Sequence, residues 1–271
     1  MISEIHQSSL NMILRCGEQF RRRYLEGDII PPSVAAARGT GVHKASQVNL
    51  RNKIRTKEDL PLADLLDAAR DGYVNALKEG VYLPKEDQPS KKRILNNGLE
   101  DALRCTRVYR EKVAPNLDPK LVEEPFLINL NLELPLAGTI DFVTVNNVLG
   151  DLKTSERSWS STRAQEEIQP IFYSLAYEHL YGTRPRFLYF ILLARRDKDG
   201  APSSETWQVE DVEVLDKHYA ALLAKISLMI RMLRAAVFPP ALPTSWWCSE
   251  RWCGYYTTCP YVGNVLPGKW V

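Results

Sequence analysis

The chain has 271 residues, of which 45% are hydrophobic and 25% charged, and its formal net charge is +2. This composition is typical of a soluble globular protein and excludes a disordered chain, while the small net charge excludes a protein that coats nucleic acid through bulk charge. No stretch is long and apolar enough to span a membrane, and the first residues lack a signal-peptide pattern, so we expect a cytoplasmic protein with one domain over 1–271.

The first 115 residues have mainly helical periodicity. The segment 8–27 is predicted to be one helix that contains Cys16 and ends at Gly27. A second helix, over about 36–50, is expected to carry His43. The same period recurs over 59–80 and 91–114, which predicts a helical N-terminal part, 1–115.

From about residue 116 the pattern changes to short apolar runs with β-branched residues and turn signals, which predicts a meander of strands over 121–154. The elements expected after it are a helix over 162–181 interrupted by Pro170, a buried strand over 186–196, a strand over 204–214, a helix over 215–237 and a cysteine-rich tail over 241–271. The predicted class is α/β, with a core over 116–240 made of a mixed central sheet flanked by helices.

Asp141, Asp151 and Lys153 form the clearest candidate site. Hydrolysis of a phosphodiester needs a cation to stabilise charge and to lower the pKa of the attacking water, and hard divalent cations prefer carboxylate oxygens. Asp151 and Lys153 are two residues apart on a predicted strand, so they point to the same face.

The loop between the two acidic strands decides whether the aspartates can meet. A two-residue loop at 146–147 would place Asp141 and Asp151 on opposite faces of the sheet. A three-residue loop, 145–147, pairs Thr144 with Val148 and sets Asp141 opposite Asp151. We therefore predict an odd-length loop or a bulge, with an asparagine in the left-handed conformation.

Four short motifs occur in an order that resembles a known family. They are "GTGVH" ending in His43, "GTID" ending in Asp141, "DLK" at 151–153 and "QPIFY" at 169–173. Together with the opening helix they resemble the RecB-type branch of the PD-(D/E)xK nucleases. The resemblance implies a restriction-endonuclease-like core, hydrolysis of DNA and a need for Mg²⁺ or Mn²⁺.

The resemblance also implies roles for individual residues. His43, Asp141, Asp151 and the Leu152 carbonyl would bind the divalent cation, and Lys153 would orient or deprotonate the attacking water. Gln169 and Tyr173 would face the site from the following helix. Considered alone, these last two residues equally suit a helix cap and a core tyrosine, and Glu124 suits either an exposed position or a supporting acid.

Four of the five cysteines lie near the two ends of the chain: Cys16, Cys248, Cys253 and Cys259. Four thiolates are the usual ligands of an iron-sulfur cluster or a structural zinc, and buried free thiols are the remaining alternative. The layout is similar to that of the [4Fe-4S] subset of the family, which includes the AddB nuclease domain and the family-four CRISPR-associated nucleases, although this chain has four residues between Cys248 and Cys253 where those proteins have two. Cys105 is most simply a packed thiol.

The expected function is hydrolysis of single-stranded DNA ends by an exonuclease that leaves 5′-phosphates, in recombination, repair or CRISPR adaptation and with proteins of those pathways as partners. The alternative is a non-catalytic factor that binds DNA ends and keeps the fold and the cluster. "GNVLPGKW" at 263–270 lacks the hydroxyl and the helix of a phosphate-binding loop. Candidate phosphate contacts lie in the basic runs 21–23, 51–57, 91–93 and 195–196.

Overall fold

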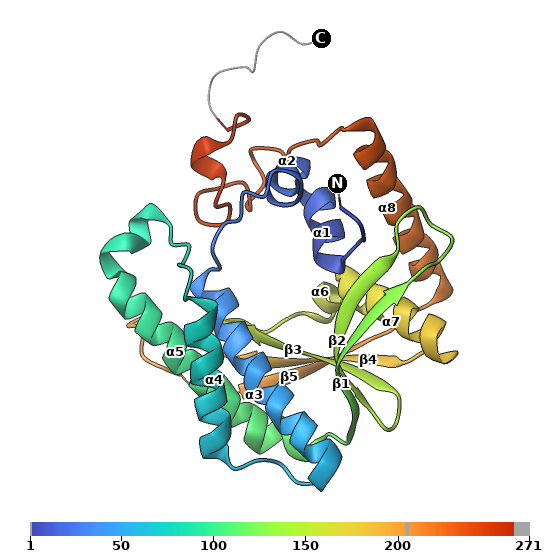
Figure 1. The fold of residues 1–271 in the computed structure, drawn as a ribbon. Coiled ribbons are helices and arrows are strands. Elements are labelled where there is room, and N and C mark those ends of the chain that lie inside the picture. Colours follow the sequence, from blue (N-terminus) through green and yellow to red (C-terminus); the bar gives the residue numbers. More distant parts are fainter. Residues whose placement is uncertain (1, 204–205, 263–271) are drawn as a thin grey trace.

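One five-stranded sheet organises the computed structural model, which describes residues 2–203 and 206–262 (Figure 1). The β3–β4 pair is parallel and the other neighbouring strands are antiparallel, so the sheet is mixed, as predicted. The strands, in both chain and spatial order, are β1 (Pro119–Ile128), β2 (Leu136–Thr144), β3 (Val148–Ser155), β4 (Arg186–Leu193) and β5 (Thr206–Val212).

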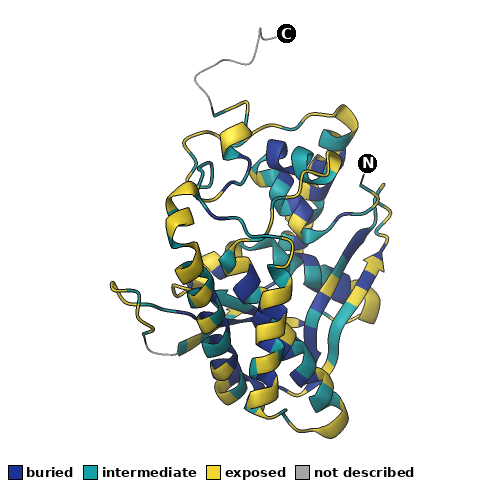
Figure 2. Ribbon diagram, turned by 60° about the vertical axis from the view of Figure 1, so that its left-hand side comes forward, coloured by how far each residue is buried: buried dark blue, intermediate teal, exposed yellow. Residues whose placement is uncertain are grey.

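Helices cover both faces of the sheet, and each face has its own apolar core. Leu152, Phe142 and Phe190 pack with one group of helices, whereas Tyr189 and Ile191 pack with the other. The first group is α3 (Val34–Thr56), α4 (Leu62–Ala76) and α5 (Lys91–Val108), and the second is α1 (Gln7–Arg15), α7 (Ile168–Tyr181) and α8 (Asp216–Ala235). Figure 2 shows exposed residues concentrated on the outer sides of the helices, as two covered sheet faces require.

Short elements complete the described fold. They are α2 (Gly17–Phe20), α6 (Ser161–Glu166), the π-helical turns Arg21–Leu25 and Tyr109–Val113, and the 3₁₀ turns Lys85–Ser90, Ala114–Asn116 and Tyr256–Thr258. The predicted interruption of the 162–181 helix at Pro170 is wrong in position. The break is at Glu167, whose backbone is extended, and Pro170 lies in the first turn of α7, where a missing N–H removes no helical hydrogen bond. No described helix has the length and apolarity needed to cross a membrane.

The sheet forks between β2 and β3. These strands pair only at Phe142–Gly150 and Val143–Leu149, whereas β1 and β2, like β3 and β4, pair along most of their lengths. In Figure 1, β1 and β2 turn away from the other three strands beyond this short contact. Asp141 and Asp151 are the next residues on the two strands, so they lie where the ladder stops.

The hairpin that carries the two aspartates has the predicted register. Thr144 ends β2 and Val148 begins β3, which leaves the three-residue loop 145–147. Asn147 is in the left-handed conformation, with φ 57°. Its side-chain oxygen accepts hydrogen bonds from Lys120 Nζ at 2.6 Å and Tyr177 Oη at 3.0 Å, which fix the turn. The two carboxylates therefore share one face.

The predicted single helix over 8–27 is wrong at Cys16. This residue has an extended backbone, φ −160° and ψ 106°, and separates α1 from α2. The cause is a segment far along the chain: Gly17 N donates to Pro239 O at 2.7 Å, and a Cβ at Gly17 would lie 2.5 Å from the Phe238 carbonyl carbon. The predicted end of the segment is confirmed, because Gly27 has φ 74°.

Residues 241–262 run back over the N-terminal helices. Arg22 donates to Thr258 Oγ1 at 2.7 Å and to its carbonyl at 2.8 Å, and Tyr255 Oη donates to Asp28 O at 2.5 Å. These residues, the C-terminal loop, therefore fasten the end of the described chain to its N-terminal helices. The phosphate-loop-like segment 263–270 lies outside the described residues.

Candidate active site

The fork brings together four of the predicted site residues. His43 Nδ1, from α3, lies 3.2 Å from Asp141 Oδ2, and Lys153 Nζ lies 2.7 Å from Asp151 Oδ2. Asp151 is almost fully buried, whereas the side chains of His43 and Asp141 are 31% and 21% exposed. The site therefore has a closed side at Asp151 and an open side at His43.

Gln169 connects the acid and the lysine from the first turn of α7. Its amide donates to Asp151 Oδ1 at 2.5 Å, and its oxygen accepts from Lys153 Nζ at 2.8 Å. The amide can serve both neighbours at once because it has a donor and an acceptor. The helix-cap alternative for Gln169 gains no support, since no side-chain cap is found at the start of α7.

Tyr173, one turn further along α7, combines packing with proximity to the acids. Its ring meets Phe126 edge to face, with centroids 5.9 Å apart. Burial, followed by the negative charges of Asp141 and Asp151, raises the pKa of its hydroxyl. Tyr173 is therefore neutral in the working pH range and faces the charged site as a hydroxyl.

The charges of the site are strongly interdependent. Burial opposes ionisation of His43, but the adjacent Asp141 carboxylate more than offsets this and raises the pKa of His43 to about 9. Burial likewise disfavours charged Lys153, yet Asp151 and Asp141 raise its pKa. For Asp151 burial dominates and raises the pKa, whereas His43 lowers that of Asp141 despite burial.

The donor set fits a hard divalent cation. Asp141 Oδ2 and Asp151 Oδ2 are buried and have ion-pair neighbours but no hydrogen bond of good geometry. Two carboxylates and an imidazole are ligands that Mg²⁺ or Mn²⁺ accepts. Among the described residues, no group of three His, Cys, Asp or Glu side chains already has metal-ligand geometry; the acids instead contact His43 and Lys153.

Glu123 is a site residue that sequence reasoning missed. The β1–β2 register places it opposite Asp141, and after burial the Asp141 carboxylate is the next cause that raises its pKa. Its backbone is left-handed, with φ 53°, which is uncommon for glutamate. Glu124, the predicted candidate, instead accepts from Tyr181 Oη at 3.5 Å.

The left-handed backbone of Glu123 interrupts the regular alternation of β1, and the sequence carries a faint signal of this irregularity. Val122 and Phe126 are four residues apart and would share one face of a regular strand, yet they pack in opposite cores. The strand therefore changes face between them, and Glu123 lies at that change. Two consecutive glutamates between inward-facing apolar residues mark the irregular position.

Gly150 and Leu152 set the position of Asp151 from either side. A Cβ at Gly150 would lie 2.0 Å from Phe142 Cζ, so only glycine lets the ring cover the strand. The Leu152 side chain is 1% exposed and packs among α3, α4 and α5, which directs Asp151 and Lys153 to the other face.

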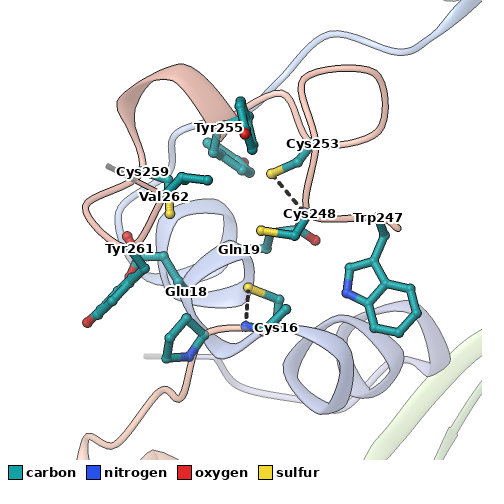
Figure 3. A pocket seen from close by; sticks show the side chains of 13 residues that line it. Cys16, Glu18, Gln19, Trp247, Cys248, Cys253, Tyr255, Cys259, Tyr261 and Val262 are labelled. Carbon is teal, nitrogen blue, oxygen red and sulfur yellow. Dashed lines mark hydrogen bonds between the residues drawn. The ribbon is translucent and has the colours of Figure 1, made fainter. Parts of the chain in front are cut away.

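The four predicted cysteines meet at one pocket between the α1–α2 break and the C-terminal loop. Figure 3 shows the sulfur atoms of Cys16, Cys248, Cys253 and Cys259 around this space. Gln19 Nε2 donates to Cys253 Sγ at 3.0 Å and Ala241 N donates to Cys16 Sγ at 3.3 Å. Burial and the neighbouring thiols raise the pKa of Cys248. Cys105 lies elsewhere, buried in the core beside α3 and α4.

The sequence model of the PD-(D/E)XK nuclease superfamily matches residues 4–260. The chain therefore belongs to the PD-(D/E)XK nuclease superfamily, whose members typically use a divalent metal. The mixed sheet flanked by helices agrees with that fold.

Two solved structures are similar over nearly the whole chain. One is the crystal structure named "Putative exonuclease" from Eubacterium rectale, with 14% identity, a TM-score of 0.56, and coverage of 99% of this chain and 91% of that one. The other, named SSO0001, has 14% identity and a TM-score of 0.45, with coverage of 97% and 89%. At this identity the first likeness supports the fold alone. No curated protein sequence matches the chain.

Proposed function

We propose that the chain is a cytoplasmic, Mg²⁺- or Mn²⁺-dependent deoxyribonuclease of the RecB-type branch that degrades single-stranded DNA from its ends and leaves 5′-phosphates. The observation that carries the proposal is the meeting of Asp141 and Asp151 across the fork with His43 and Lys153 beside them. Recombination, repair or CRISPR adaptation is the proposed setting, with proteins of those pathways as partners.

The residues would divide the work between cation binding and charge control. Asp141, Asp151, His43 and the Leu152 carbonyl would hold the cation, which when bound supplies charge for the phosphate and lowers the pKa of water. Lys153, 2.7 Å from Asp151 Oδ2, would orient or deprotonate the attacking water and offset charge on the phosphate. Gln169 fixes Lys153 relative to Asp151.

The activity is tested with Mg²⁺ and with Mn²⁺ on end-labelled linear DNA and on closed circular DNA, each in single- and double-stranded form. Asp151→Asn and Lys153→Met should each lower the rate at least about 100-fold, while Asp211→Asn, an exposed acid paired with Arg186, serves as the matched control. Linear single strands should be cut and circles spared. Equal rates in wild type and both site variants would refute the mechanism. Binding of DNA ends without cleavage by wild type would instead support the non-catalytic end-binding alternative.

We further propose that Cys16, Cys248, Cys253 and Cys259 hold a [4Fe-4S] cluster that fastens the C-terminal loop to the N-terminal helices, so that 1–271 folds as one domain. Four sulfur atoms at one pocket are the right type of donor for such a cluster, and within residues 2–203 and 206–262 no three of them already have metal-ligand geometry. Iron and sulfide analysis with a visible spectrum should show the cluster in wild type and in Cys105→Ser but not in Cys248→Ser. Zinc without iron would indicate the structural-zinc alternative, and the absence of both metals would indicate free thiols.

A further inference from the structure

Two basic runs that are distant in the sequence meet on one side of the molecule. Lys92 and Arg93 line a hollow of about 480 Å³, Arg196 lines a second hollow of about 550 Å³, and the two hollows share Asn97. Arg196 pairs with Glu100 and Asp101, and acids also pair with the other two basic runs. Arg21 and Arg22 both pair with Glu18, and Lys53 pairs with Asp59.

The larger hollow begins close to the candidate active site. Glu156 and Arg157, which line it, follow directly after β3, only three and four residues beyond Lys153. Arg38 also lines it and donates to Thr154 Oγ1, at 3.3 Å, on the face of β3 that α3 covers. The hollow therefore lies at the carboxyl end of β3, and a polymer that leaves it has to pass round this end to reach Lys153 and the acids on the other face.

The cations of the two hollows differ in how firmly they are engaged. Arg38 and Arg196 are held by Asp101, at 3.9 and 2.8 Å, and serve the fold. Arg157 is exposed, and its side chain has no partner within the described ranges 2–203 and 206–262. Arg251 has an exposed ion pair, at 3.5 Å with Glu86, which contributes little.

The lining as a whole is mildly basic. Six lysine and arginine side chains line the two hollows against four acids. The lining acids are Asp87, Asp101, Glu156 and Asp197. Of these, Asp101 is committed to the buried arginines, and Asp197 accepts from the backbone N–H groups of Asp199 and Ala201. Arg157, Arg251 and Lys92, whose side chain has no partner within the described ranges, are consequently the cations most available to an anionic polymer.

Two exposed tryptophans continue this surface. Trp246 and Trp252 are 66% and 59% exposed, and their rings meet edge to face with centroids 5.4 Å apart. The Arg251 guanidinium lies 6.0 Å from the Trp252 ring centroid, so the aromatic pair adjoins the arginine hollow. Tyr82 Oη donates to Glu250 O, and Lys85 N donates to Glu250 Oε1 at 3.3 Å, which anchors the loop.

We propose that Arg157, Arg251, Trp246 and Trp252 form a binding track for single-stranded nucleic acid that leads to the active site. Guanidinium groups would contact the phosphates, and the indole rings would stack on unpaired bases. Stacking needs base faces that a duplex hides, so the track favours single strands. The inference rests on the proposed nuclease function and adds to it the path of the strand outside the fork.

Fluorescence anisotropy with a labelled oligothymidylate, in Ca²⁺ to prevent cleavage, tests the track. Trp252→Ala should weaken binding at least about fivefold, since each stacked base contributes about 1 kcal/mol or more. Arg157→Ala combined with Arg251→Ala should reduce the slope of log affinity against log salt by about 1.4, that is, about 0.7 for each lost phosphate contact. Binding of a duplex should not change in Trp252→Ala.

Matched controls come from exposed residues outside the track. Trp207→Ala, on β5, controls for loss of an exposed indole, and Arg70→Ala controls for loss of an arginine in an exposed ion pair. Unchanged single-strand affinity and salt slope in the track variants would overturn the inference, and that is also the result expected if a protein partner covers this face. Wild type that fails to bind single strands would overturn it as well.

A small substrate separates the inference from the proposed function. Bis(p-nitrophenyl) phosphate needs only the acids at the fork, so wild type and Trp252→Ala should hydrolyse it equally, which also shows that the variant is folded. If wild type hydrolyses neither this diester nor DNA, the proposed function is refuted. The anisotropy results would still decide whether the track binds single strands.

Discussion

Gly150→Ala should disturb the active site although it changes no catalytic group. The new Cβ would lie 2.0, 2.3 and 2.8 Å from three atoms of the Phe142 ring. Phe142 is 1% exposed and packs against Phe190 with centroids 5.8 Å apart, so the ring cannot move aside. Such overpacking costs about 1–3 kcal/mol, which lowers the melting temperature of a chain of this size by about 2–12 °C.

The activity should fall further than the stability suggests. Phe142–Gly150 is the last pair before Asp141 and Asp151, so a shift of the strand there moves one carboxylate relative to the other. A displacement of about 1 Å can lower the rate roughly 100-fold. Thermal melting and metal-dependent hydrolysis of single-stranded DNA, measured on the same preparations, give both quantities.

A control substitution at another glycine and a double variant test whether the effect of Gly150→Ala is steric. Gly39→Ala, in α3, meets only Thr154 Oγ1 at 3.7 Å and should be neutral or stabilise the helix by up to about 1 kcal/mol. Phe142→Leu removes the colliding ring, so Gly150→Ala with Phe142→Leu should cost at least about 1 kcal/mol less than the sum of the single changes. Strictly additive costs would refute the steric explanation.

Three further predictions concern polar groups. Gln169→Ala should lower the single-turnover rate about 100-fold and leave the melting temperature within about 3 °C, because the amide orders Asp151 and Lys153. Glu123→Gln should raise the Mg²⁺ concentration for half-maximal hydrolysis about tenfold, by removing a carboxylate beside Asp141. Hydrogen bonds from Arg184 lower the pKa of Glu178 below 4.5, so the stability it confers is present above that pH and is lost as pH falls through the lowered pKa. Urea unfolding of wild type and Glu178→Gln should therefore differ by about 1 kcal/mol at pH 7 and by progressively less below pH 4.

Local rules in the sequence were sufficient to predict the hairpin of the active site. Side chains alternate along a strand, so the requirement that Asp141 and Asp151 share a face left only an odd loop length, and Asn147 supplies the left-handed residue such a loop needs. The helix that carries His43 was visible in part: it was expected over about 36–50 and runs over Val34–Thr56.

Long-range contacts decided what the sequence could not predict. The break at Cys16 depends on Pro239, which accepts from Gly17 N and belongs to a segment more than 200 residues away. The choice between Glu123 and Glu124 depends on the register of β1 with β2, which the connection 129–135 does not determine, and on a left-handed residue inside a strand. Neither feature follows from propensity or period.

The fork explains why the acids need support from both cores. Asp141 belongs to the β1–β2 half of the sheet and Asp151 to the β3–β4–β5 half, and beyond Phe142–Gly150 no ladder hydrogen bond ties the halves together. Their relative position is therefore set by side-chain packing, from α3 on one face and α7 on the other. These are also the helices that supply His43 and Gln169. The same helices thus position the carboxylates and provide the groups that contact them, so a change in either core should alter the geometry of the whole site.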